Sequence, residues 1–177
     1  MTGPLGALRA SAVLAIAALA TLLQVSLAPH LAWRGVGPDL ALLVVVAAGL
    51  AWGAHSGLLL GFGAGVVLDL VPPADHLVGR WALALMVVGY VAGRVRADLR
   101  PDRRPALGTI VATAAACSFV GTSVFALSGL VLGDATTGVG GLLGVILASV
   151  VWDVALAVLL VPVLLRALAR LEPEHAR

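Results

Sequence analysis

Three aspartates interrupt strongly apolar stretches of the chain, where a carboxylate can bind a ligand, relay a proton or hold the end of a helix. Asp39 follows Pro38, Asp69 closes the stretch "GLLLGFGAGVVLDL", and Asp153 lies inside "SVVWDVAL". An ionised carboxylate in the middle of a membrane-spanning helix costs at least about 2.5 kcal/mol. Such acids need polar partners, and the partners decide which of the three chemistries applies.

Asp39 and Asp153 occupy different settings. Asp39 comes after a proline at a predicted helix start, where an acid accepts hydrogen bonds from free amides and faces the positive end of the helix dipole. Asp153 falls near the middle of an apolar segment, so it should face the bundle interior, protonated or hydrogen-bonded. Its candidate partners are Gln24, Thr113, Ser118 and Thr122. We interpret Asp153 as a structural polar link; a proton relay or ligand contact is the functional alternative, without a second mid-membrane acid or base to complete it.

A glycine occurs at every fourth position ahead of Asp69, which places these glycines on one helix face and lets another backbone approach closely. The members of this glycine stripe are Gly57, Gly61 and Gly65. In one interpretation the stripe packs within the chain, and Asp69 forms a salt bridge to Arg80 or Arg34. In the other interpretation, the transmembrane helix of a partner docks on the stripe, or Asp69 covers a small binding site. The sequence leaves both open.

A polar site is predicted at the outer end of the bundle. Asp39 opens one short predicted helix and Asp69 nearly closes the next, so antiparallel packing of the two helices brings both acids to the same level. Arg80 falls in the loop region on that side. We expect Asp39, Asp69 and Arg80 to form this polar outer site.

The elements that position these residues are membrane helices. The chain has 177 residues, of which 61% are hydrophobic and 11% charged, and its mean hydropathy is +1.10. A spanning helix needs roughly 20 apolar residues, or fewer where the bilayer thins. Six segments qualify, at about 10–29, 39–54, 57–71, 81–93, 106–132 and 141–166. We therefore predict an all-α integral membrane protein, a six-helix bundle that forms one domain over residues 1–177.

Arginines predict the orientation, because basic residues collect in short cytoplasmic loops. A chain that crosses the membrane six times has most of its arginines on one side of the membrane: Arg9, Arg94, Arg96, Arg100, Arg103, Arg104, Arg166, Arg170 and Arg177. Both termini are therefore predicted to be cytoplasmic. A signal peptide ending in "SLA" is the alternative for the first segment. Its removal would put the arginine-rich loop and the C-terminal arginines on opposite faces, so a retained helix is favoured.

The cytoplasmic basic loop combines five arginines: Arg94, Arg96, Arg100, Arg103 and Arg104. We expect it to set the orientation and to contact anionic lipids, each basic residue near the surface contributing about 1 kcal/mol. Docking of a cytoplasmic partner is the alternative. The basic residues are all arginine, which indicates a compositional bias, so the pI near 9.5 does not predict nucleic-acid binding.

Catalytic and metal-binding patterns are not apparent in the sequence. It offers no nucleophile elbow, phosphate-binding loop or paired-carboxylate hydrolase signature. The histidines are dispersed and Cys117 is the single cysteine, so no metal-ligand spacing emerges. We predict a protein that is not an enzyme and that uses no cofactor and no metal.

Residues 37–95 resemble the rod shape-determining protein MreD family. The family pattern is a Pro-Asp that opens a span, a Gly-Phe-x-x-Gly-x-x-x-Asp run, and a loop ending in Gly before a helix with Gly-Tyr. The matching positions here are Pro38, Asp39, Gly61, Phe62, Gly65, Asp69, Gly79, Gly89 and Tyr90. Length and the six-span plan agree with the family over the whole chain, whereas the long arginine-rich loop departs from it.

This resemblance implies a non-enzymatic scaffold subunit of the cell-wall elongation machinery, in the bacterial cell membrane, that supports rod shape and lateral peptidoglycan synthesis. The implied partners are an MreC-like membrane protein, the MreB filament, the polymerase RodA and a class B penicillin-binding protein. The family's bundle is also thought to resemble the substrate-binding S components of vitamin transporters. An S-component-like subunit is therefore the competing hypothesis, and it requires a pocket lined by Asp69, Asp153 and the outer loops.

Overall fold

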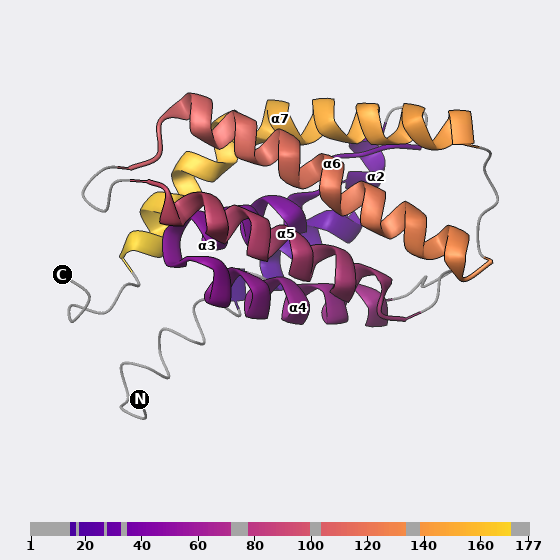
Figure 1. Cartoon of the computed structure of the whole chain (residues 1–177), viewed down its shortest axis with the longest axis horizontal. Helices are drawn as coiled ribbons and strands as arrows, with labels where there is room; N and C mark the ends of the chain where they lie inside the picture. The colour runs from indigo at the N-terminus through magenta and orange to yellow at the C-terminus, as the bar shows by residue number, and fades with distance from the viewer. Residues whose placement is uncertain are drawn as a thin grey trace.

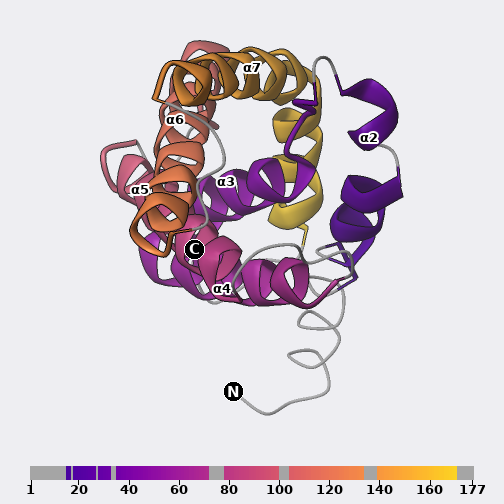
Figure 2. The same cartoon turned by 90° about the vertical axis from the view of Figure 1, so that its right-hand side faces the viewer.

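The computed structural model describes residues 15–16, 18–26, 28–32, 35–71, 78–99, 104–133 and 139–170. Within these residues the elements are helices: α2 (Ala28–Leu31), α3 (Leu40–Trp52), α4 (Ala54–Leu70), α5 (Arg80–Ala97), α6 (Leu107–Val131) and α7 (Val139–Ala169). Residues 18–26 are also helical and precede α2. The all-α prediction is confirmed, and Figures 1 and 2 show the helices gathered into one bundle.

The core of the bundle is α3. Every residue from Ala41 to Leu50 is buried, as expected for a helix that is apolar on all sides. Helices α4, α5, α6 and α7 all contact α3, and in Figure 2 it lies inside the ring that they form. Whatever satisfies the polar groups at the ends of α3 must therefore come from the protein itself.

The glycine stripe packs against α5 of the same chain. A Cβ on Gly57 would meet the carbonyl of Gly89, and one on Gly61 would meet the carbonyl of Leu85. A Cβ on Gly65 would meet the backbone of Ala82. The backbones of α4 and α5 are thus in direct contact along the whole stripe. Of the two interpretations that the spacing left open, the structure shows packing within the chain, and α5 occupies the space that the other interpretation gave to a partner helix.

Two helix boundaries differ from the sequence prediction. The predicted spans 39–54 and 57–71 leave His55 and Ser56 as their connection, but α3 ends at Trp52, α4 begins at Ala54, and Gly53 alone lies between them. Gly53 adopts φ +86°, a backbone conformation that glycine tolerates and other residues rarely do, and its N–H donates to the carbonyl of Gly49 at 2.8 Å. The second difference is at the end of α5, which continues to Ala97, beyond the predicted end at residue 93. Arg94 and Arg96 lie in its last turn.

Two helices in the described part of the chain, α6 and residues Gly141–Ala169 of α7, are long and apolar enough to cross a membrane by length and composition. Helices α3 and α4 are apolar but shorter. The predicted count of six spans therefore stays a prediction. Helix α7 changes direction in its second half (Figures 1 and 2), and it contains Pro162, which lacks the N–H of a regular helix and kinks it.

A pair of glycine substitutions tests the α4–α5 packing. Gly61→Ala should destabilise the bundle by about 1–3 kcal/mol, because its Cβ is driven into the α5 backbone; for a chain of this length that lowers the midpoint of thermal unfolding by roughly 2–12 °C. Gly63 lies on the same helix with nothing within 4 Å of its Cβ position, so Gly63→Ala should be neutral or slightly stabilising. Circular dichroism of the detergent-solubilised chain measures both, and equal midpoints would contradict the packing.

Candidate functional site

The first turn of α3 is held by a network of side chains, which we call the α3 cap cluster: Gln24, Asp39, Ser118 and Asp153. The Asp39 side chain accepts from the N–H of Leu42 at 2.9 Å, which confirms Asp39 as the N-cap. Gln24 Oε1 accepts from the N–H of Leu40 at 2.6 Å, and Gln24 Nε2 donates to the carbonyl of Pro38 at 3.1 Å. The free amides of a helix that begins inside the protein are thereby satisfied.

Asp153 completes this cluster from α7. Its Oδ1 accepts from the backbone N–H of Asp39 at 2.7 Å, and its Oδ2 accepts from the Ser118 hydroxyl at 2.6 Å. The side chain is only 1% exposed, so it faces the bundle interior as predicted. Among the four candidate partners, the structure assigns Ser118 to Asp153 and Gln24 to the α3 backbone. Asp153 therefore joins α7 to α3 and α6.

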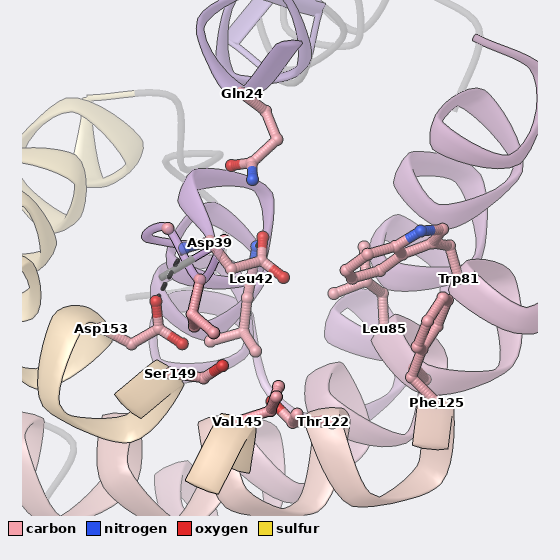
Figure 3. Close-up of a pocket in the computed structure, with 15 residues that line it drawn as sticks. Gln24, Asp39, Leu42, Trp81, Leu85, Thr122, Phe125, Val145, Ser149 and Asp153 are labelled. Atoms are coloured by element: carbon pink, nitrogen blue, oxygen red, sulfur yellow. Dashed lines mark hydrogen bonds between the residues drawn. The ribbon is translucent and has the colours of Figure 1, made fainter. Parts of the chain in front are cut away.

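A cavity of about 340 Å³ lies beside the α3 cap cluster. Its walls come from α3, α5, α6, α7 and residues 35–37. Figure 3 shows the Asp39 and Asp153 carboxylates on one side of this space and the rings of Trp81 and Phe125 on the other. Asp69 does not line the cavity, whereas the competing transporter hypothesis required both Asp69 and Asp153 there.

Asp69 caps the next helix along the chain. Its carboxylate accepts three backbone N–H groups, from Gly79 at 2.9 Å, Trp81 at 3.1 Å and Ala82 at 3.0 Å. Gly79 occupies the N-cap position of α5 with φ +104°, and a glycine has no side chain with which to cap. The acid that ends α4 therefore supplies the cap of α5, and with 1% of its surface exposed it does so inside the protein.

Arg80 reaches from the start of α5 to the end of α6. Its Nη2 donates to the carbonyl of Phe125 at 2.9 Å, and its Nε donates to the Ser128 hydroxyl at 3.4 Å. The guanidinium lies 4.1 Å from the centroid of the Phe125 ring, within cation–π range. A Cβ on Gly129 would fall on the guanidinium. A positive charge near the C-terminal end of a helix is stabilising, so Arg80 ties α5 to α6.

The predicted polar outer site is thus two neighbouring clusters. Asp39 binds within the α3 cap cluster, whereas Asp69 and Arg80 organise the start of α5. Trp81 takes part in both regions: its backbone N–H donates to the Asp69 carboxylate, and its ring lines the cavity. The centroid of the Trp81 ring lies 4.6 Å from that of the Phe125 ring. Of the two arginines that one interpretation paired with Asp69, Arg34 lies outside the described residues, and Arg80 binds α6 through Nη2 and Nε. A salt bridge to Asp69 stays a prediction.

Some functional positions left no signal in the sequence. Phe125, Ser128 and Gly129 contact the Arg80 side chain because one particular turn of α6 faces it. Hydropathy along the sequence does not show which turn that is. In the basic loop, Arg94 and Arg96 form the last turn of α5, and Arg104 precedes α6; Arg100 and Arg103 lie outside the described residues. Among the described residues, no three His, Cys, Asp or Glu side chains gather as metal ligands would.

Fold and site define a small apolar helical bundle in which buried carboxylates fasten helix ends, with two helices suited to crossing a membrane. The chain belongs to the family described as rod shape-determining protein MreD, which it matches over residues 7–171. That membership assigns it to a membrane-associated family with a role in rod shape determination. The comparisons with curated proteins and with solved structures each returned no match.

Two acids at opposite ends of α5 provide a matched test of the Asp69 cap. Asp69→Asn removes a charged acceptor of three amides, so we expect a loss of about 2 kcal/mol and a fall of roughly 4–8 °C in the unfolding midpoint. Asp98 is exposed at the C-cap of α5, where a negative charge is unfavourable. Asp98→Asn should leave the midpoint unchanged or raise it slightly. A midpoint insensitive to Asp69→Asn would overturn the cap.

Proposed function

We propose that the protein is a non-enzymatic scaffold subunit of the cell-wall elongation machinery, which helps maintain rod shape and lateral peptidoglycan synthesis. The family match over residues 7–171 carries this proposal. The use of the buried acids supports it. Both oxygens of Asp69 and both oxygens of Asp153 accept hydrogen bonds from the protein's own groups, so these acids hold helices in place.

The proposed location is the bacterial cell membrane, crossed six times, with both termini in the cytoplasm. Figure 1 supports a common orientation of the arginines, because the end of α5, the start of α6 and the end of α7 lie at the same end of the bundle. Those ends carry Arg94 and Arg96, Arg104, and Arg166. Asp39, Asp69 and Arg80 belong to helix ends on the opposite side, which the positive-inside rule makes extracytoplasmic.

The proposed partners are an MreC-like membrane protein and, through the same machinery, MreB, RodA and a class B penicillin-binding protein. Membership of the family is consistent with an MreC-like partner. Because α5 fills the glycine stripe, a partner helix has to bind outside it. The competing interpretation, a vitamin-transporter subunit, is not favoured: the family match is to a shape-determining family, and Asp69 caps α5 and is not among the residues that line the cavity.

Asp153 distinguishes a scaffold from a proton relay or a charge-dependent ligand site. Asp153→Asn keeps the shape of the side chain: its oxygen can still accept from the N–H of Asp39, and its amide can donate to Ser118. A scaffold should therefore still restore rod shape in cells depleted of their own family member, and should co-purify with the MreC-like protein. Asp153→Leu removes both hydrogen bonds, strands the buried amide of Asp39, and should fail in both assays.

Microscopy of the complemented cells and affinity purification through a C-terminal tag provide the measurements. Protease added outside intact cells should leave that tag uncut if the C-terminus is cytoplasmic. Round cells with Asp153→Asn at normal protein abundance would contradict the scaffold, because the lost property would then be the ionisable group. Failure of the unaltered chain to restore rods or to retain the MreC-like protein would also contradict it.

A further inference from the structure

A second crevice, of about 210 Å³, lies at the arginine-bearing end of the bundle. It lies between the start of α6 and the end of α7, the two helices that are long and apolar enough to cross a membrane. Its walls are mainly apolar: Leu107, Ile110, Pro162 and Leu165. With both helices crossing the membrane, as the proposed function has them, this crevice would open at the level of the lipid headgroups.

Two arginines from different helices border this crevice. Arg104 precedes α6 and Arg166 lies in the last turn of α7, and both are exposed. Within the part of the chain that the structure describes, neither side chain has a hydrogen bond or an ion pair. Two guanidinium groups at one crevice attract a shared anion, and their planar donor geometry suits a phosphate.

The start of α6 adds to this attraction. Its N-cap is Ala106, which makes no side-chain hydrogen bond to the first amides, in contrast to α3 with Asp39 as its cap. The uncapped amides and the positive end of the dipole of a 25-residue helix favour a negative group at this position. The crevice is thus cationic at its rim and apolar along its walls.

We propose that this crevice binds an anionic phospholipid. Its phosphate lies between Arg104, Arg166 and the first turn of α6, and part of an acyl chain covers the apolar wall. The apolar wall distinguishes this ligand from a free phosphate, which would gain nothing from Leu107 or Pro162. The proposal goes beyond the scaffold function, because it assigns a defined lipid site at the arginine-bearing end of the bundle.

The test is lipid retention by the purified full chain, in nanodiscs containing phosphatidylglycerol and phosphatidylcholine in equal amounts. Native mass spectrometry after mild delipidation should show phosphatidylglycerol retained in preference. Arg104→Gln and Arg166→Gln should each reduce that preference about fivefold. Arg94→Gln removes an exposed arginine at the same end of the bundle but outside the crevice, and should leave the preference within about twofold.

A second pair of variants tests the apolar wall. Leu107→Trp fills the crevice without changing its charge, and should abolish retention. Leu130 is exposed near the other end of α6, so Leu130→Trp is the matched control and should retain the lipid. Both exchanges are made at exposed leucines, so the bundle should fold in each case, which circular dichroism verifies.

Three outcomes would overturn the proposal. Equal losses from Arg94→Gln and Arg104→Gln would indicate diffuse surface charge. Displacement of the lipid by inorganic phosphate at millimolar concentration would indicate a phosphate site, and undiminished retention with Leu107→Trp would place the lipid elsewhere. Because retention is measured on the purified chain, its failure leaves the rod-shape assay unaffected, and the two proposals can fail separately.

Discussion

The rest of the structure depends on the hydrogen bonds at the buried start of α3. A helix surrounded by other helices cannot pass its free amides to water, and an unsatisfied buried amide costs about 1–3 kcal/mol. Asp39, Gln24 and Asp153 supply the acceptors at this end, and they come from three parts of the chain. The hydrogen bonds that satisfy the first amides of α3 therefore also fix how α7 and the helical residues 18–26 lie against it.

The start of α5 repeats this arrangement with different residues. Asp69 lies at the end of α4 and caps α5. Arg80, at the start of α5, donates a hydrogen bond to the end of α6. The rings of Trp81 and Phe125 are in contact with each other and line the cavity beside the α3 cap cluster. A bundle fastened at helix ends by buried polar side chains has few alternative packings, because sliding one of these helices by a turn would leave the polar groups without hydrogen-bond partners. Such rigidity is consistent with the proposed scaffold function.

Much of the fold was predictable, because hydropathy and helix-cap chemistry act locally along the sequence. The apolar segments anticipated the helices, and Pro38-Asp39 anticipated the cap of α3. The partner of the glycine stripe was not predictable, since a four-residue spacing shows that a backbone approaches without showing which one. The role of Asp69 as a cap was not predictable either, because the helix that it caps begins eleven residues later, at Arg80, and Gly79 leaves that helix start without a side-chain cap of its own. Such tertiary pairings have no local signature.

Hydrogen exchange at the first turn of α3 tests the central claim most directly, because it reads the protection of individual amides in the unaltered protein. If buried side chains cap this helix, the amides of Asp39, Leu40 and Leu42 should exchange as slowly as those in the middle of α3, when followed by nuclear magnetic resonance in detergent micelles. Protection of this kind requires opening of the packed bundle before exchange. Exchange of these three amides at the rate of an exposed loop would contradict the account.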